Sequence, residues 1–362
     1  MRAVSLPVRA AGLRGCVERL RADSVAVTVV THNSEAYIRA CLEAVLSQVH
    51  PACEVTVVDN ASRDGTLDAV NPFRGRIRVI ENKVNIGFAA AQNQAIDSTR
   101  SAWVLTLNPD TELEPDFLTQ LMAAADEAAP DLGTLCGKLR SMHADLTRPR
   151  GEAVIDSTGI FFTDELRHFD RGWGEADRGQ FDRREYVFGA TGAAALYRRS
   201  MIEAVRTAAG FFDPAFFAYR EDADVAWRAQ LLGWRCLYVP EAVGYHVRRV
   251  RPGRRDRIPA LINMHSVKNR FLMRVNNLTG PVWRQSAWPS LRRDLFVLGG
   301  CVLAEPRSLP AFWHLLRALP SAWRQRREIM ARARTGAELA DWFGNVRRAE
   351  YVPVTATAAR VR

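Results

Sequence analysis

Trp103-Val-Leu-Thr-Leu-Asn-Pro-Asp110 is an apolar strand that ends abruptly in an amide, a proline and a carboxylate. In an open α/β sheet, ligands bind beyond the carboxyl ends of the strands, where loops present polar groups without disturbing the core. A hard divalent cation that bridges to substrate phosphates needs only one or two protein carboxylates there. Asn, Pro and Asp are also common turn residues, so this run taken alone favours a plain loop, and the neighbouring sequence must decide.

Strand and helix patterns alternate on both sides of this run. Apolar segments typical of buried strands occupy residues 25–30, 54–58, 76–80 and 102–107. Helical spacing occurs at 88–98, at 116–128 and at 35–49, where one face carries Ile38, Cys41, Leu42, Val45, Leu46 and Val49. The alternation predicts an α/β fold with a mostly parallel central sheet and helices on both of its faces.

The middle of the chain is less regular. Residues 140–186 carry charges, glycines and aromatics without steady periodicity, which predicts long loops over an active site. A regular pattern resumes at residues 189–197. A helix is predicted at 222–232, and Gly233 is placed to end it. The inward positions of that helix are Val225, Ala226, Ala229 and Leu232.

The C-terminal part differs in charge. The net charge is +10, and residues 247–362 hold 23 Arg and Lys against 7 Asp and Glu, so the basic excess is entirely C-terminal. Nucleic acid, anionic lipid and an anionic lipid-linked substrate would each suit such an excess. Apolar residues recur at helical spacing beside an arginine cluster, which is the composition of an interfacial helix: Phe312, Leu315, Leu316, Leu319 and Trp323. A helix packed on the rest of the protein fits equally well, and Pro320 is expected to divide the helix in two.

Size and cysteine content narrow the class of protein. The 362 residues are 48% hydrophobic and can bury a substantial core, so disorder is not expected. The six cysteines form no CxxC pair, and we expect reduced thiols of a cytoplasmic protein. No stretch approaches the roughly 20 apolar residues of a membrane-spanning helix.

Polar residues, together with one glycine, follow the first four predicted strands and are candidates for binding a ligand. In chain order they are Thr31, Asn33, Asp59, Asn60, Asn85, Gly87, Asn108 and Asp110. The sequence lacks GxGxxG and GxxxxGK[ST], which disfavours a dinucleotide fold and a P-loop. A nucleotide held without either loop normally has its diphosphate neutralised by a metal, and Asp110 is well placed to bind that metal.

Four ordered motifs resemble the nucleotide-sugar half of the family 2 glycosyltransferases. They are Thr31-His-Asn-Ser34, Asp59-Asn-Ala-Ser-Arg-Asp-Gly-Thr66, Asn85-Ile-Gly-Phe-Ala-Ala-Ala-Gln-Asn93 and Asn108-Pro-Asp110. The run Phe211-Phe-Asp-Pro-Ala-Phe-Phe-Ala-Tyr-Arg-Glu-Asp-Ala-Asp224, with Arg228 and Gly233 after it, is similar to that family's acceptor-side motif. The match covers roughly residues 24–250 in order and spacing. It implies a type A glycosyltransferase fold that uses an activated sugar and inverts its anomeric centre.

The resemblance also implies roles for individual residues. The donor would be bound by the strand-end residues named above other than Asp110, together with Asn93. Mg²⁺ or Mn²⁺ would be held by Asp110 and His246. Inversion needs a base on the acceptor side, which would be Asp222. Glu221 and Asp224 would raise the basicity of Asp222 by like-charge proximity or orient its loop. Taken alone, the acidic cluster favours the simpler interpretation of a helix N-terminus.

Three departures from the family pattern are visible. Asn-Pro-Asp replaces Asp-x-Asp, which leaves Asp110 as the one firm carboxylate ligand, and Gln92 stands where many relatives have an arginine. Val247-Arg248-Arg249 follows His246, and these arginines are expected to hold the diphosphate. Asn-Pro-Asp together with Asp156-Ser-Thr-Gly159 looks most like the rhamnosyltransferase branch, whose donor is dTDP-L-rhamnose. UDP-hexose and UDP-galactofuranose are the alternative donors.

The leading hypothesis is therefore an inverting, metal-assisted sugar transferase that acts on a lipid-linked or cell-envelope glycan. We expect an N-terminal extension (1–22), a catalytic domain (23–255) and a basic, amphipathic helical region (256–362) that contacts the membrane or a polyprenyl-diphosphate-linked acceptor. The protein is expected to be cytoplasmic and peripheral on the inner, anionic face of the cell membrane. A nucleotide-binding scaffold without catalysis and a nucleic-acid-binding protein are the alternatives from other classes, and no nucleic-acid recognition motif is visible.

Overall fold

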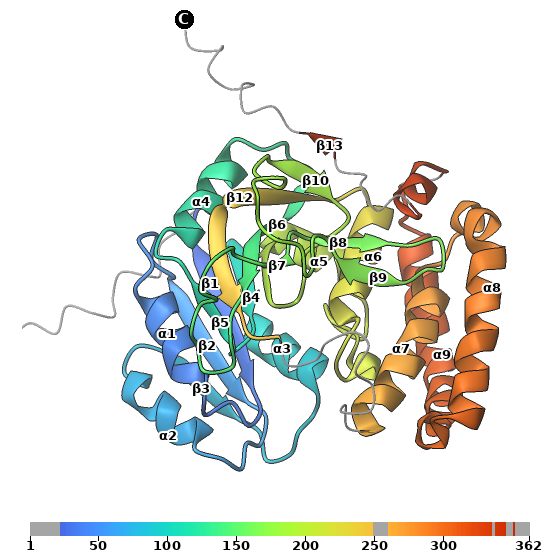
Figure 1. Cartoon of the computed structure of the whole chain (residues 1–362), viewed down its shortest axis with the longest axis horizontal. Coiled ribbons are helices and arrows are strands. Elements are labelled where there is room, and N and C mark those ends of the chain that lie inside the picture. Colours follow the sequence, from blue (N-terminus) through green and yellow to red (C-terminus); the bar gives the residue numbers. More distant parts are fainter. Residues whose placement is uncertain (1–21, 249–259, 335–336, 345–349, 352–362) are drawn as a thin grey trace, which may run out of the picture.

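The computed structural model describes residues 22–248, 260–334, 337–344 and 350–351. Strands and helices alternate in its N-terminal half as the sequence predicts (Figure 1). These elements are β1 (Val25–Thr31), α1 (Ile38–Leu46), β2 (Glu54–Asp59), α2 (Thr66–Val70), β3 (Arg78–Glu81), α3 (Phe88–Asp97), β4 (Trp103–Leu107), β5 (Thr111–Leu113) and α4 (Phe117–Asp126). Helix α1 is shorter than predicted, because the chain turns away after Leu46 and the Val49 N–H donates to the Pro115 carbonyl. Val49 is consequently 70% exposed instead of buried.

The second half adds shorter strands and three long helices. The elements that follow α4 are β6 (Leu132–Ser141), β7 (Ile155–Ser157), β8 (Ile160–Phe162), β9 (His168–Asp170), β10 (Glu185–Val187), β11 (Ala194–Arg198), α5 (Arg199–Val205), α6 (Glu221–Leu231), β12 (Arg235–His246), α7 (Ala260–Asn277), α8 (Gly280–Leu303), α9 (Pro310–Met330) and β13 (Glu350–Tyr351). The segment expected to be long loops thus contains four short strands. Gly233, at φ +80°, ends α6 as predicted.

One sheet holds most strands of the described residues, in the order β13-β10-β12-β6-β11-β4-β1-β2-β3. The predicted parallel pairing is confirmed for β4, β1, β2 and β3. The sheet as a whole is mixed, because β11 enters antiparallel to both β4 and β6, and β10 pairs antiparallel with β12. Among the described strands beyond β4 in this order, β12 and β6 pair parallel to each other.

Helices cover both faces of the sheet, as predicted. Along β1 the odd-numbered valines, such as Val27, pack in one core with α1 and α4, whereas Ala26 packs in a second core with α3, α5 and α6. This alternation follows from the two-residue period of a strand. Because β1 is buried on both faces, its sequence is almost continuously apolar.

The register of the parallel strands brings their polar ends to one rim. Thr31 of β1 lies opposite Asp59 of β2, and Asp59 lies opposite Glu81 of β3. The three loops that follow these strands therefore start at the same level, which is where an open α/β sheet binds its ligands.

Helices α7, α8 and α9 group at one end of the molecule, away from α1 and α2 (Figure 1). Pro320 does not divide α9, which continues from Pro310 to Met330 with Pro320 inside it. Leu272 and Met273 of α7 and Ile329 of α9 belong to the same buried core as Trp227 of α6. The proposed boundary at 255/256 lies outside the described residues, but the helices after it share a core with the sheet.

The length and hydropathy of the helices bear on whether any of them could span a membrane. Among the described residues, no single helix is long and apolar enough to cross a bilayer. The pair Gly280–Leu303 and Pro306–Met330, bent by 113°, meets those criteria only when its two members are taken together.

Candidate active site

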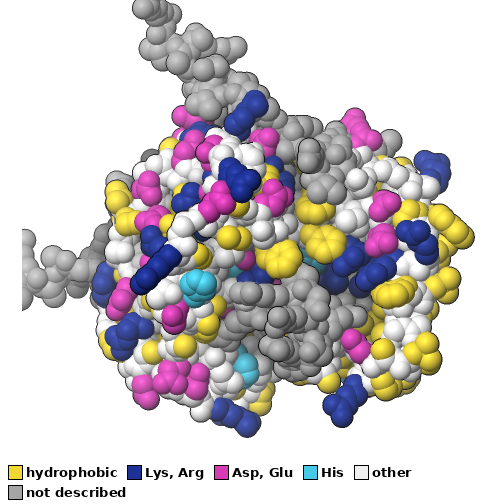
Figure 2. Space-filling model, viewed as in Figure 1, with side chains coloured by type: hydrophobic (Ala, Val, Ile, Leu, Met, Phe, Trp, Pro, Cys, Tyr) yellow, Lys and Arg dark blue, Asp and Glu magenta, His cyan; other side chains and the backbone are white. Residues whose placement is uncertain are grey.

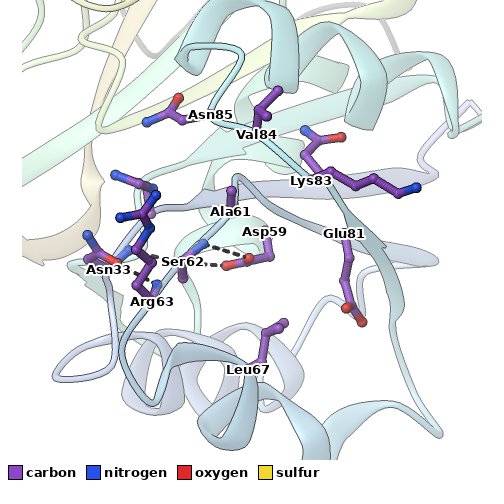
Figure 3. A pocket seen from close by; sticks show the side chains of 12 residues that line it. Asn33, Asp59, Ala61, Ser62, Arg63, Leu67, Glu81, Lys83, Val84 and Asn85 are labelled. Atoms are coloured by element: carbon purple, nitrogen blue, oxygen red, sulfur yellow. Dashed lines mark hydrogen bonds between the residues drawn. The ribbon is translucent and has the colours of Figure 1, made fainter.

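A cavity of about 600 Å³ opens at the rim formed by β1, β2 and β3. Figure 3 shows its lining, with the Asp59 carboxylate and Ser62 joined by hydrogen bonds. The residues around it are His32, Asn33, Asp59, Ala61, Ser62, Arg63, Leu67, Glu81, Asn82, Lys83, Val84 and Asn85. Asn33, Asp59 and Asn85 were predicted to bind a donor. The cationic Arg63 and Lys83 were not predicted, because single charges in loops carry no distinctive spacing.

Asp59 is fixed by its neighbours at the base of this cavity. Its Oδ1 accepts hydrogen bonds from Thr31 Oγ1 at 2.9 Å and from Ser62 Oγ at 2.6 Å, and its Oδ2 accepts from the Ser62 N–H at 3.0 Å. Thr31 therefore acts by orienting Asp59 and does not line the cavity itself. Oδ2 accepts only one of these three bonds and has a further lone pair, so Asp59 can still accept a hydrogen bond from a base or a ribose.

An amide network fixes the opposite wall of the cavity. Asn60 Nδ2 donates to Asn85 Oδ1 at 2.8 Å, and Asn60 Oδ1 accepts from the Ile86 N–H and from Asn82 Nδ2. Asn60 is 2% exposed, so it supports Asn85 from behind. Asn85 Oδ1 also accepts the Gly87 N–H at 2.9 Å. Residues far apart in sequence are thus assembled into one rigid rim.

Two residues predicted to bind the donor instead connect the two halves of the protein. The side-chain amide of Asn93 makes both of its hydrogen bonds with the backbone of Phe212, at 2.7 and 2.9 Å. Gly87 has φ +87°, and a β-carbon there would lie 2.6 Å from the Phe217 ring. Glycine is required at this position by conformation and by space. Neither residue lines the cavity.

The predicted metal ligands lie next to each other. His246 Nε2 is 3.4 Å from Asp110 Oδ1, although 136 positions separate the two residues in the chain. His246 Nδ1 is 2.8 Å from Asp156 Oδ2. Burial lowers the pKa of His246, but the carboxylates of Asp156 and Asp110 outweigh it and raise that pKa to about 10.

This donor set fits a divalent cation only in part. In residues 22–248 and the other described ranges, no three His, Cys, Asp or Glu side chains converge to hold a metal by themselves. Asp110 and His246 supply two ligands, and Asp156 orients His246 from its far nitrogen, as a carboxylate commonly does behind a metal-bound histidine. A Mg²⁺ or Mn²⁺ ion there would need oxygens of a bound diphosphate to complete its shell.

Arg248 is engaged with carboxylates and is not directed at a diphosphate as predicted. Its guanidinium contacts Asp156 at 2.7 Å and Asp170 at 2.6 Å. These two ion pairs hold β9 against the end of β12, since Asp170 is the last residue of β9. Arg249, the second arginine of that prediction, lies outside the described residues.

The acceptor-side carboxylates lie at the start of α6. Asp222 Oδ2 accepts the Gly192 N–H at 2.8 Å, and burial followed by the charge of Asp170 raises the pKa of Asp222. Glu221 is 6% exposed, and its Oε2 has no hydrogen-bond partner within the described part of the chain. Burial and the neighbouring Asp222 raise the pKa of Glu221 to about 8. The carboxyl group of Glu221 therefore keeps its proton at neutral pH.

Asp224 has a different environment from its two neighbours. It is fully buried, pairs with Arg228 at 2.8 Å and accepts hydrogen bonds from Asn276 and Asn277 of α7. A carboxylate with this many partners is not available to a substrate. These contacts assign Asp224 to the anchoring of α6, and of its two predicted roles they favour the orientation of the segment that carries Asp222.

Residues Gly192 and Ala193 link the metal-side run to the acceptor-side carboxylate. The Ala193 carbonyl accepts hydrogen bonds from the Asn108 N–H at 2.9 Å and from Thr111 Oγ1 at 3.4 Å. Gly192, next to it, binds Asp222. A β-carbon on Gly192 would lie 3.3 Å from Asp222 Oδ2, so the backbone approaches this carboxylate closely.

Comparison with known proteins agrees with this geometry. The family model described as "Glycosyl transferase family 2" matches residues 26–206. EpsH of Bacillus subtilis is 26% identical over 233 residues, which cover 63% of this chain and 62% of EpsH. The N-acetylglucosaminyl-diphospho-decaprenol L-rhamnosyltransferase of Mycobacterium tuberculosis is 27% identical over 263 residues, which cover 64% of this chain and 78% of that enzyme. This chain thus spans less than two thirds of EpsH.

The fold is shared with solved structures. GalNAc-T7, crystallised with UDP, GalNAc and Mn²⁺, superposes with a TM-score of 0.58 at 14% identity, over 84% of this chain and 55% of that one. At this identity the similarity concerns the fold alone, and it confirms the predicted type A architecture.

Proposed function

The chain belongs to glycosyltransferase family 2, and from that premise we propose an inverting, metal-assisted transfer of a sugar from a nucleoside diphosphate to a hydroxyl group. One observation carries this proposal. The Asn108 N–H, in the run Asn108–Asp110, donates to the Ala193 carbonyl, and the carboxylate of Asp222 accepts from the N–H of the adjacent Gly192. A base and a diphosphate site are thereby held on two sides of a common point, as inversion requires.

In the proposed reaction, Asp222 accepts the proton of the acceptor hydroxyl while that oxygen forms a bond to the anomeric carbon. The bond from this carbon to the diphosphate oxygen breaks, and the electron pair leaves with the nucleoside diphosphate. A divalent ion bound by Asp110 and His246 would neutralise charge on the departing diphosphate. Asp59, Asn33 and Asn85 would hold the nucleoside in the 600 Å³ cavity.

The proton on Glu221 contributes to this assignment. A carboxyl group that keeps its proton at position 221 places no second negative charge beside Asp222, which is the residue that contacts Gly192. The raised pKa of Asp222 makes it a stronger base than a solvated carboxylate.

The test is Asp222→Asn, measured by transfer of labelled sugar and by calorimetric titration with the donor. We expect transfer to fall by at least about 10³-fold while donor affinity stays within about twofold, because Asp222 lies on the acceptor side. Asp110→Asn should raise the Mn²⁺ concentration needed for half-maximal transfer, because it removes a metal ligand. Exposed Asp126, at the end of α4, provides the matched control Asp126→Asn. Near-normal turnover of Asp222→Asn would refute the assignment.

For the donor we propose dTDP-L-rhamnose, and for the acceptor a lipid-linked or cell-envelope glycan. The support is the similarity to the mycobacterial rhamnosyltransferase, whose name specifies a polyprenyl-diphosphate-linked acceptor. The structure adds that Asp156, within the run that resembles the rhamnosyltransferase branch, stands directly behind His246. A panel of nucleotide sugars with membrane lipid extract tests this donor, and turnover with UDP-hexose alone would favour the alternative.

We also propose a location at the anionic inner surface of the cell membrane. Large apolar side chains are exposed along α8 and α9, including Trp288 at 76% and Leu295 at 71%. Figure 2 shows hydrophobic side chains gathered over the end of the molecule that α8 occupies. Exposed arginines accompany them: Arg292, Arg317, Arg324 and Arg327. A contiguous apolar surface bordered by cations is suited to an interface with anionic lipid.

A further inference from the structure

The segment that leads into α6 has an unusual backbone. Phe217, Tyr219 and Arg220 have φ values of +65°, +69° and +74°, although none of them is glycine. Side chains disfavour this left-handed region, so such a run persists only where surrounding contacts determine it. Asp222 lies two residues after Arg220, so its position depends on this segment.

Asn269 of α7 supplies the contacts that hold the segment. Its side-chain Nδ2 lies 2.9 Å from the Phe216 carbonyl, 2.9 Å from the Ala218 carbonyl and 2.7 Å from the Tyr219 carbonyl. Asn269 is completely buried, and its Oδ1 has no partner among the described residues. The side chain therefore serves as a donor only, with two hydrogens shared among three carbonyl oxygens.

The same face of α7 carries further polar contacts to this part of the chain. Lys268 Nζ donates to the Ala215 carbonyl, and Asn277 Nδ2 donates to Asp224 Oδ1 at 2.7 Å. Asn276 Nδ2 lies 3.2 Å from Asp224 Oδ1. Positions 268 and 269 are two helical turns before 276 and 277, so one stripe of α7 follows the acceptor segment from Ala215 to Asp224.

We propose that Asn269 is a positioning residue for the acceptor-side base, and that α7 supports the active site from behind through it. The inference rests on the proposed role of Asp222. It goes beyond that role, because the helix lies in the region expected to contact only membrane or acceptor. Asn269 acts through the backbone of residues 216–219 and does not touch the substrate.

The expected consequence of losing Asn269 is a shift of Asp222. Without their shared donor, the three carbonyls and the left-handed residues are free to relax, and the contact between Asp222 and the Gly192 N–H is loosened. A displacement of about 1 Å at a catalytic group is sufficient to reduce a rate by about 100-fold. The nucleotide cavity is built by β1, β2 and β3 and contains no residue of α7, so donor affinity should not change.

The test uses the full chain with Asn269→Ala and Asn269→Ser, since a serine hydroxyl is too short to reach three carbonyls. We expect kcat for transfer to fall by about 30-fold or more in both variants, with the donor Kd within twofold of the wild type. Met264→Ala is the matched control, because Met264 lies on the same helix but packs against Cys301 and Ala311, away from the acceptor segment. It should lower the melting temperature and keep kcat within about twofold.

Two outcomes would overturn the inference. One is a folded Asn269 variant whose kcat equals that of the wild type. The other is a Met264→Ala variant that loses as much kcat as the Asn269 variants when its melting temperature falls by the same amount. If Asn269→Ala does not fold, the serine variant decides. Asp222→Asn is measured in parallel. Full transfer by Asp222→Asn would refute the proposed function itself, whereas an inactive Asp222→Asn beside a fully active Asn269→Ala would refute the role of Asn269 alone.

Discussion

Glu221 shows how much of the site's electrostatics depends on one side chain. Its carboxyl group is buried, has an unpartnered oxygen and lies beside Asp222. An ionised group would be very unfavourable there, so the group retains its proton instead. The pKa of about 8, compared with an ordinary 4.5, means that folding favours the protonated form.

Glu221→Gln should flatten the dependence of stability on pH. Between pH 4.5 and 8 the unfolded chain has lost this proton while the folded chain keeps it, so the free energy of unfolding falls as pH rises. For one group the slope is at most about 1.4 kcal/mol per pH unit. Urea unfolding at pH 5 and pH 8 should show a smaller decrease for the glutamine variant than for the wild type. Identical decreases would contradict the assignment of the proton to Glu221.

At the scale of elements, each helix of the C-terminal region has its own surface character. Helix α7 presents amides and a lysine to the acceptor segment and apolar residues to the core. Helix α8 contributes few buried residues, with Val282 and Cys301 among them, and leaves most of its large apolar side chains exposed. Both helices lie in the region predicted to be basic and amphipathic, and their contacts distinguish them.

The exposed face of α8 leads to a prediction about lipid binding. Trp288→Glu combined with Leu295→Glu should abolish sedimentation with phosphatidylglycerol vesicles, because it places two carboxylates on an apolar surface that would face anionic lipid. Val49→Glu is the matched control, since Val49 is equally exposed but lies between α1 and β2. Retained sedimentation of the double variant, or loss with the control, would count against the membrane-facing role of α8.

For the whole molecule, the sheet and the C-terminal helices are expected to unfold together. Leu272, Met273 and Ile329 share a core with Trp227, and α7 also binds the acceptor segment through Asn269 and Asn277. Differential scanning calorimetry should therefore show a single transition. Two resolved transitions would indicate that residues 23–255 and 256–362 are independent domains, as the division made from sequence suggested.

Much of the cavity rim could be predicted because its residues lie at or just after the ends of successive parallel strands. The order of Thr31, Asp59 and Asn85 along the chain is also their order around the rim, so a local pattern was sufficient. The same pattern could not distinguish Asn93 from the residues that line the cavity. It stands in the same motif as Asn85, but its amide is used by the backbone of Phe212, and a contact over 119 positions leaves no trace in the spacing.

The alternating apolar segments, the strand-end polar residues and the acidic run at 221–224 determined by themselves that this chain forms an α/β fold with two groups of polar residues. Whether Asp222 or Asp224 is available to a substrate was decided by tertiary structure. Arg228 lies one turn along the same helix as Asp224, but the burial of Asp224 and its partners Asn276 and Asn277 come from the packing of α7. The same holds for α7, whose asparagines reach the acceptor segment only once the helix is packed beside α6. Secondary structure follows from local periodicity, whereas the chemistry of a carboxylate depends on which distant groups surround it.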